Sequence, residues 1–315
     1  MAGPRIGYLL PTREQIMQGR PAARPLLDLA SRAEALGFDS IWIGDSLTAR
    51  PRHDPLTLLA AVAARVPRVQ IGTAVLLPAL RNPVLLAHQA ATIDQISEGR
   101  LILGVGIASD APSIRAEFEA AGVPFEKRVG RMMEGLRLCR ALWQGEPVDW
   151  EGRWTLRAAT VAPVPHRPGG PLLWIGGHSP GSLARAGRFF DGWFPLAPDP
   201  QGFARGLAEV RTAAQAAERP PEAVAGAMYL TVALADSVAA GEAMLDGFLG
   251  HYYNRPGAEM LARQACYAAG PEAGLGECLA AYAAAGVSHF CLRFAGGHEA
   301  HQDAVARVRA GLGWR

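Results

Sequence analysis

The sequence predicts an α/β fold, a closed (β/α)8 barrel or TIM barrel, as a single domain over residues 1–315. Three observations lead to this prediction. Strand-like and helix-like segments alternate along the chain, as they do in parallel sheets covered by helices. The segments LILGVGI at 101–107 and WIGG at 174–177 are almost continuously apolar, which is typical of strands buried on both faces. Eight such units in about 300 residues favour a closed barrel over the alternative, an open doubly wound sheet.

The strands are expected where short apolar runs end at glycine, proline or polar residues. In chain order they cover residues 5–10, 39–43, 69–75, 101–107, 172–176, 192–194, 226–235 and 287–294. The helices are expected where apolar residues recur with helical spacing, and several start with proline and end at glycine, as in LGFD, SEGR and AAGVSH. In chain order they cover residues 25–36, 55–65, 83–97, 128–143, 181–189, 201–217, 237–249 with 259–268, and 272–285.

An insertion of about residues 108–170 separates the fourth strand from the fifth. Irregular segments at 108–124 and 145–171 flank a helix, and VDWEGRWTL within the second predicts a small hairpin. Connections of this length are usually functional. Since loops that follow strands form the catalytic face of a barrel, the insertion is a candidate lid or substrate wall. Contacts between subunits are the alternative.

Composition narrows the classes of function. Half of the residues are hydrophobic, 19% are charged, the net charge is +2 and the basic residues form no block, so we expect no nucleic-acid partner. The first residues, MAGPRIGYLLPTREQ, lack a secretory pattern, and no run approaches the roughly 18 apolar residues of a membrane span. We therefore expect a cytoplasmic protein without a membrane partner. Cys139, Cys266, Cys278 and Cys291 are widely spaced, which predicts reduced thiols.

The segment PLLWIGGHSPGSLARAGRFFDGWFP, which starts at Pro171, predicts an anion site, because a strand runs into two glycines and then into a helix. Gly176 and Gly177 allow a sharp turn close to a ligand. Ser179, Gly181 and Ser182 lie where the first helical turn presents N–H groups and the positive end of its dipole, which suits a phosphate. The alternative is an ordinary turn whose glycines serve only the backbone.

Three other motifs suggest different chemistry, and each departs from its pattern. GVGIAS at 104–109 is close to a dinucleotide fingerprint, but Ser109 replaces the third glycine and the segment lies on the fourth strand. GDSL at 44–47 matches the block of the GDSL esterases, with Ser46 as nucleophile, but no aspartate has a histidine three residues later. HEAHQD at 298–303 offers metal ligands on one helical turn without a partner elsewhere, so no metal site is predicted.

Four polar residues follow strand ends and would converge on one mouth of a barrel, namely Asp45, His53, Asp110 and His178. Each of them could instead be a helix cap or a loop hydrogen bond. From their positions, Asp45, His53 and His178 are the candidate catalytic groups.

Several longer segments resemble the bacterial luciferase-like family of flavin-dependent monooxygenases and oxidoreductases. They are GFDSIWIGDSL, VQIGTAVLLPALRNPVLLAHQAATIDQISEGRLILGVG, EFEAAGVPFEKRVGRMMEGLRLCRALWQGEPVDWEGRWTL and WIGGHSPGSLARAGRFFDGWFP. The resemblance is strong over residues 5–200 and continues weakly through GVSHFCLRF. It implies a TIM barrel that holds reduced FMN, or the deazaflavin coenzyme, at its C-terminal mouth.

The resemblance also implies a cofactor site. It places the phosphate at the glycine turn, and the ring against a non-prolyl cis peptide after the third strand and against the fourth strand. The residues concerned are Ala74, Val75, Gly104, Val105, Gly106, Gly176, Gly177, His178 and Ser179. Asp45 matches an acidic position of the family. Ser46 replaces a histidine that is common in its deazaflavin dehydrogenases, and Ser109 replaces a catalytic glutamate of its sugar-phosphate dehydrogenases. These two departures argue against a sugar-phosphate dehydrogenase.

The resemblance leads us to expect a monooxygenase that receives reduced FMN from a separate flavin reductase and oxygenates a small organic substrate with O₂. Hydride transfer between the deazaflavin and an organic substrate is the alternative, and a non-catalytic flavin-binding protein is a third. A homodimer is expected, because the helices at 55–65 and 83–97 are apolar over most of their circumference. Ala61, Val62, Leu86 and Ala90 exemplify this excess, which neighbouring helices could also cover.

Overall fold

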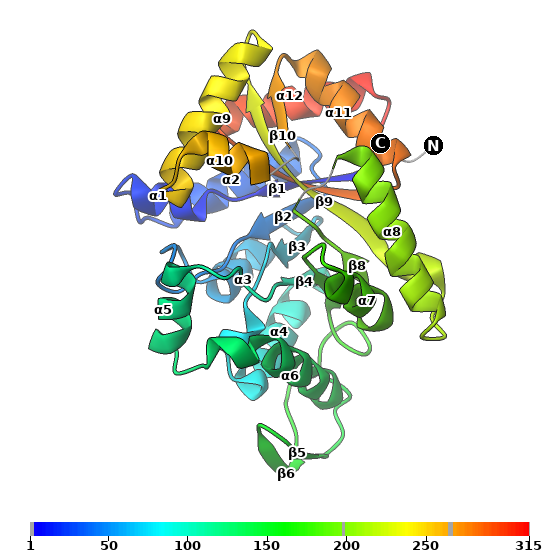
Figure 1. The fold of residues 1–315 in the computed structure, drawn as a ribbon. Coiled ribbons are helices and arrows are strands. Elements are labelled where there is room, and N and C mark those ends of the chain that lie inside the picture. The colour runs from blue at the N-terminus through cyan, green and yellow to red at the C-terminus, as the bar shows by residue number, and fades with distance from the viewer. Residues whose placement is uncertain (1–2, 197–198, 264–266, 315) are drawn as a thin grey trace.

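The computed structural model describes residues 3–196, 199–263 and 267–314, and Figure 1 shows their fold. Eight parallel strands close into a barrel, because β8 pairs with β9 and β11 pairs with both β9 and β1. In barrel order they are β1 (Arg5–Leu9), β2 (Ser40–Ile43), β3 (Gln70–Thr73), β4 (Leu101–Val105), β7 (Leu172–Ile175), β8 (Gly192–Trp193), β9 (Ala225–Leu234) and β11 (His289–Phe294). All eight predicted strands are present, and the closed barrel is confirmed.

Helices between the strands cover the outside of the barrel. In chain order they are α1 (Thr12–Met17), α2 (Arg24–Ala35), α3 (Pro55–Arg65), α4 (Pro83–Ile96), α5 (Pro112–Ala120), α6 (Arg128–Leu142), α7 (Pro180–Phe189), α8 (Pro200–Gln215), α9 (Val238–Tyr253), α10 (Gly257–Arg263), α11 (Glu272–Ala284) and α12 (His298–Gly311). Short 3₁₀ turns lie at η1 (Pro78–Leu80), η2 (Phe125–Lys127) and η3 (Pro221–Ala223). The proline-first pattern correctly predicted the starts of α3 and α4, which Asp54 and Asn82 cap with their side chains.

The structure differs from the prediction after α9. The predicted helix at 259–268 is wrong in its second half, because α10 ends at Arg263 and β10 (Tyr267–Gly270) is a strand. β8 has only two residues and pairs with the start of β9, so the end of β9 is open on that side. β10 pairs there in parallel with Thr231–Leu234. The helices α1 and α5 were also not predicted, since both are short and lie in segments interpreted as loops.

The interior of the barrel is filled by large rings. Trp42 from β2 and Trp174 from β7 contact each other with ring centroids 5.4 Å apart. Glycines on neighbouring strands leave the room they need, since a Cβ at Gly72 would lie 2.5 Å from Trp42 and one at Gly192 2.5 Å from Trp174. His289 completes this layer, and its Nε2 lies 2.7 Å from Ser40 Oγ. The lower barrel is therefore a packed core, and ligands must bind above it.

The insertion after β4 contains α5, η2, α6 and the predicted hairpin, which is confirmed as β5 (Val148–Glu151) and β6 (Thr155–Ala159). In Figure 1 the hairpin extends away from the barrel below α6, whereas α5 stands near α3 at one side. Within the insertion, α5 lies beside the loop after β2, and α6 contacts η1 in the turn after β3, where Arg131 Nε donates to Ala79 O.

Most of the apolar residues of α3 and α4 that led us to expect a dimer are covered within one chain. Val62, Leu86 and Ala90 are fully buried within one chain, and only Ala61 of the four residues is exposed. α4 packs against both α3 and α6, while Leu85 and Ile96 of α4 remain exposed. The homodimer remains a prediction.

Cysteines and membrane segments give two further findings. Cys139 and Cys291 are buried free thiols, whereas Cys266 lies outside the described residues. Burial raises the pKa of the Cys291 thiol. Within residues 3–196, 199–263 and 267–314, no helix is long and apolar enough to cross a membrane.

The buried imidazole of His289 should make the fold less stable in acid. Burial, with a smaller effect of the Arg5 charge, lowers its pKa from the ordinary 6.5 to about 3. Below pH 6.5 the unfolded chain therefore takes up a proton at His289, whereas the folded chain does not until the pH approaches about 3. Over this range the free energy of unfolding falls by about 1.4 kcal/mol for each pH unit. Between pH 7 and pH 5, His289→Asn should lose about 2 kcal/mol less unfolding free energy than the wild type in urea titrations. Equal losses in the two proteins would contradict this assignment, and His88→Asn at an exposed position is the control.

Candidate functional site

The connection from β7 to α7 forms the predicted turn at the C-terminal rim of the barrel. Gly177 has a φ of 106°, which favours glycine, and a Cβ there would lie 2.6 Å from Ser182 Oγ. Trp193 Nε1 donates a hydrogen bond of 2.8 Å to the carbonyl oxygen of Gly177 and fixes the turn. Ser179 caps α7 by accepting from Ser182 N. The chain thus approaches the N-terminal end of α7, where N–H groups and the helix dipole attract anions.

Arg185 adds a positive charge to this turn. Its Nη2 donates to Ser182 Oγ over 3.2 Å, and a Cβ at Gly181 would lie 3.4 Å from its Nη1. Its Nε is buried and has no hydrogen-bond partner among the described residues, and burial lowers the pKa of Arg185. A phosphate beside α7 would supply both an acceptor and the opposite charge. The sequence analysis missed Arg185, whose only signal is its position one turn after Ser182.

The turn after β3 has the cis peptide that the resemblance implies, between Ala74 and Val75. Leu76 N donates to the carbonyl of Gly104, and Gly106 N donates to the carbonyl of Leu76, so this turn is bonded to the end of β4. A Cβ at Gly104 would lie 2.1 Å from Thr73 O, and one at Gly106 2.7 Å from Val75 Cγ2. The two glycines of β4 are therefore explained by the close approach of the two strands, and a cofactor contact is not needed to account for them.

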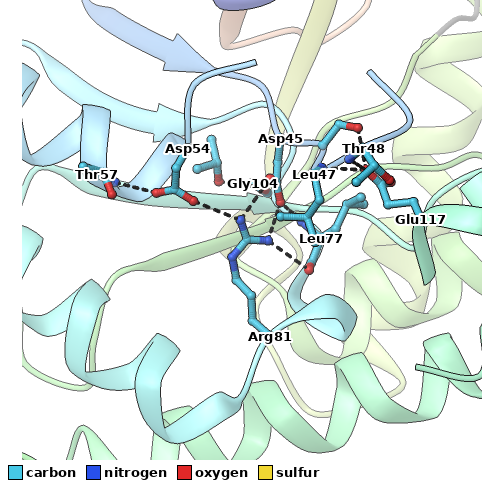
Figure 2. A network of polar contacts seen from close by, with 11 residues as sticks. Asp45, Leu47, Thr48, Asp54, Thr57, Leu77, Arg81, Gly104 and Glu117 are labelled. Carbon is cyan, nitrogen blue, oxygen red and sulfur yellow. Dashed lines mark hydrogen bonds and ion pairs between the residues drawn. The ribbon is translucent and has the colours of Figure 1, made fainter. Parts of the chain in front are cut away.

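Asp45 is buried in a network that holds the same turn, as Figure 2 shows. Its side chain is 1% exposed and forms a two-pronged ion pair with Arg81, at 2.5 and 2.9 Å. Leu77 N also donates to its Oδ2 over 2.9 Å. Arg81 additionally lies 3.5 Å from Asp54 Oδ2, at the start of α3. With its oxygens engaged in this way, we interpret Asp45 as a positioning residue and not as a proton-transfer group.

Glu117 of α5 anchors the loop after β2 (Figure 2), although the sequence analysis did not select it. The side chain is fully buried, and its Oε1 accepts from Ser46 Oγ at 2.6 Å. The backbone N–H groups of Leu47, Thr48 and Ala49 also donate to Oε1. Ser46 is therefore bonded to a carboxylate and has no histidine base, so the esterase motif is accidental. Nothing in the sequence distinguishes Glu117 from its neighbour Glu119 in the run EFEA, so the sequence gives little indication of its role.

The other candidate catalytic residues do not meet Asp45 directly. His53 Nε2 lies 2.8 Å from the carbonyl oxygen of Pro21, and its Nδ1 is buried without a partner in the described part of the chain. His178 is exposed at the start of α7. Asp110 is exposed as well and pairs with Arg115, whose hydrogen bond lowers the pKa of Asp110. Of the four polar residues predicted to converge, His178 is the one that belongs to the turn before α7, next to Ser179.

Arginine and tyrosine side chains form a cluster near β9 and β11. Arg293 is buried, and it donates to Thr231 Oγ1 at 2.8 Å and to Tyr253 Oη at 3.1 Å. Its guanidinium also lies 5.1 Å from the ring centroid of Tyr252. Arg52 Nη2 donates to Tyr252 Oη over 3.1 Å. These residues come from β9, β11, α9 and the loop before α3, and no spacing in the sequence predicts that they meet.

The HEAHQD segment does not form a metal site. His301 uses both ring nitrogens, since Nδ1 lies 2.8 Å from Gly297 O and Nε2 accepts from Leu234 N at 3.0 Å. His298 Nδ1 lies 2.8 Å from Tyr8 Oη. No group of three or more histidine, cysteine, aspartate or glutamate side chains suited to a metal ion occurs in the described ranges.

Many barrel enzymes bind a ligand phosphate at the C-terminal rim, beside a helix N-terminus like that of α7. The family model described as luciferase-like monooxygenase matches residues 4–314, and the chain belongs to this family. The resemblance seen in the sequence is confirmed: the chain is a member of the luciferase-like family, whose members include monooxygenases and other oxidoreductases.

Sequence relatives include a phthiodiolone/phenolphthiodiolone dimycocerosates ketoreductase of Mycobacterium sp. (strain JLS), 34% identical over 74% of this chain and 66% of the relative. An F420-dependent glucose-6-phosphate dehydrogenase of Rhodococcus erythropolis (strain PR4 / NBRC 100887) is 37% identical over 54% of this chain and 52% of its own. The chain thus spans between about half and just under two thirds of the length of these relatives.

Solved structures share the fold at low sequence identity. An F420-dependent secondary alcohol dehydrogenase in complex with an F420-acetone adduct has a TM-score of 0.83 at 20% identity, over 99% of both chains. The monooxygenase RslO1 from Streptomyces bottropensis has a TM-score of 0.80 at 22% identity, over 98% of both chains. At this identity they show the barrel fold alone.

Loss of one partner of the buried Asp45–Arg81 ion pair should strongly destabilise the fold. Arg81→Met leaves the Asp45 carboxylate buried without its cation, which should lower the unfolding free energy by about 3–5 kcal/mol. The double variant Asp45→Asn/Arg81→Met removes both charges and should recover part of this loss. Urea denaturation of the two variants and the wild type measures both effects. A single variant within about 0.5 kcal/mol of the wild type would show that the pair is not what holds the turn.

Proposed function

We propose that the protein transfers hydride between the deazaflavin coenzyme F420 and a small organic ketone or alcohol. The observation that carries the proposal is the anion site at the start of α7, formed by the Gly177 turn and Arg185. It lies at the end of a barrel strand, where barrel enzymes bind ligand phosphates.

The residues of this turn fit a phosphate-bearing coenzyme. The buried Nε of Arg185 needs an acceptor, and the space beside Gly177 would be closed by any Cβ. Gly177, His178 and Ser179 would hold the phosphate with their backbone or side-chain donors, whereas the N–H of Gly176 donates to Val105 O and Gly176 only shapes the turn. Ala74, Val75 and the segment 104–106 are proposed to flank the ring, as the resemblance implies. When bound, the coenzyme supplies or accepts the hydride.

The sequence relatives favour the deazaflavin over FMN. The Rhodococcus relative is named as F420-dependent, and the mycobacterial relative is named as a ketoreductase. A reaction on a sugar phosphate is not proposed, because Ser46 and Ser109 stand at the two family positions noted above. The same phosphate site would serve a monooxygenase that uses reduced FMN, O₂ and a separate flavin reductase. This function, expected first from the sequence, is the second candidate, and the description of the matching family as luciferase-like monooxygenase supports it.

Titration and turnover separate the two functions. The purified protein is titrated with F420 and with FMN, and each reduced cofactor is then mixed with a panel of ketones with and without O₂. Tight F420 binding and oxygen-independent oxidation of reduced F420 by a ketone would support the proposal. FMN binding with product formation only in O₂ would establish the monooxygenase. Failure of both cofactors to bind would overturn the phosphate-site assignment as well.

A charge at Gly181 tests the phosphate site without straining the turn. Gly181 is exposed in the first turn of α7, where an acidic residue stabilises the helix itself. Gly181→Glu should weaken binding of the preferred cofactor at least about tenfold, because it repels the phosphate and pairs with Arg185. Gly181→Gln, of equal size and no charge, should bind within about twofold of the wild type. Equal affinity of all three proteins would place the phosphate elsewhere.

A further inference from the structure

A cavity of about 460 Å³ lies between α1, the second half of α9 and the connection from β11 to α12. In Figure 1 these elements lie together on the side of the barrel where α1 and α9 are labelled. Most of the surface exposed in the cavity is apolar and comes from residues such as Pro11, Met17, Phe248, Tyr252 and Phe294. Polar and charged side chains also line it, namely Glu14, Gln15, Gln18, Arg20, His251 and His298. The volume suits an organic molecule with an apolar body.

A neutral hydrogen-bonding pair lies at one wall of this cavity. His298 lines the cavity, and its Nδ1 lies 2.8 Å from the hydroxyl of Tyr8, which is fully buried. The Tyr8 ring stacks on Phe294 with centroids 5.1 Å apart, so its hydroxyl is held in place. Burial lowers the pKa of His298 from 6.5 to about 4, and burial raises that of Tyr8. Both side chains are therefore uncharged at neutral pH.

We propose that this cavity binds the organic substrate, a ketone or the corresponding secondary alcohol with an apolar body, and that His298 Nε2 hydrogen-bonds its oxygen. The inference rests on the proposed function, since it assigns the substrate site of that reaction and narrows the substrate to one with an apolar body. It gives the protein a polar substrate contact that the sequence analysis did not select, in place of the residues missing at Ser46 and Ser109.

The tautomers of the pair explain why both forms of the substrate fit. A neutral imidazole has one donor and one acceptor nitrogen, and a tyrosine hydroxyl can donate or accept. When Tyr8 donates to Nδ1, Nε2 carries the hydrogen and donates to a carbonyl oxygen. When Tyr8 accepts from Nδ1, Nε2 accepts from an alcohol hydroxyl. One site can thus hold both members of the redox couple without a change of charge.

The cavity is linked to the turn at which the ring is proposed to lie. Its wall residue Tyr252 accepts a hydrogen bond from Arg52, as described above. Arg52 lies against the end of β2, because a Cβ at Gly44 would lie 2.4 Å from its Nη1. The same Cβ would lie 3.6 Å from Ala74 O. A continuous set of contacts therefore runs from the cavity to the cis peptide.

Binding of three small probes to the cofactor-free protein tests the inference without turnover. Acetophenone and 1-phenylethanol carry the oxygen, and ethylbenzene has the same apolar body without it. Their dissociation constants are measured by ligand-detected NMR at pH 7.5 for the wild type, His298→Phe, Tyr8→Phe and the exposed control His88→Phe. Circular dichroism checks that each variant is folded.

We expect His298→Phe to weaken both oxygen-bearing probes about tenfold and ethylbenzene less than twofold, and Tyr8→Phe to act in the same direction more weakly. His88→Phe should change none of the three. Met17→Trp, which fills the cavity, should weaken all three probes. Equal binding of the oxygen-bearing probes to the wild type and to both His298→Phe and Tyr8→Phe would overturn the inference, as would full binding to Met17→Trp. Because no cofactor is present, these outcomes are independent of the F420 and FMN titrations that test the proposed function.

Discussion

The mouth of this barrel depends on the buried ion pair between Asp45 and Arg81. Taking two charges out of water is costly, and the cost is offset only when further hydrogen bonds complete the site. Here Leu77 contributes both its N–H and its carbonyl oxygen, and Asp54 adds a second carboxylate 3.5 Å from Arg81. The partners come from the loop after β2, the turn after β3 and the start of α3. One pair therefore fixes three neighbouring segments, and Glu117 attaches the insertion to the first of them.

This framework divides the mouth into two sides of different chemistry. At the end of β7, the start of α7 and Arg185 provide positive potential for a phosphate. Near β9 and β11, Arg293 and Arg52 are surrounded by tyrosine rings, and a largely apolar cavity opens beside them. The cis turn at Ala74 lies between these sides in our proposal, since it contacts β4 and, through the region of Gly44, Arg52. Cofactor and substrate would thus meet over a turn that the ion pair holds rigid.

The sequence was sufficient for the barrel because buried strands and proline-started helices have local signals, and LILGVGI or PVLLAHQ carry them within one segment. It also located the Gly177 turn, whose backbone conformation demands glycine. It assigned proton chemistry to Asp45 because position after a strand does not reveal the partner, and Arg81 lies 36 residues later. Tyr8 and His298 are 290 residues apart, so only the closed barrel brings them together. β10 was missed because YAAG has little strand propensity, and the open edge of β9 decides its conformation.

A crystal structure of the protein with its preferred cofactor, F420 or FMN, tests the central claim most directly. The account predicts phosphate density at hydrogen-bond distance, about 3 Å, from backbone N–H groups among residues 177–179 and 181 and from Arg185. It also predicts the ring beside Ala74 and Val75, with the cavity next to His298 left open for substrate. A phosphate bound instead at Arg52 and Arg293, on the other side of the mouth, would contradict the account.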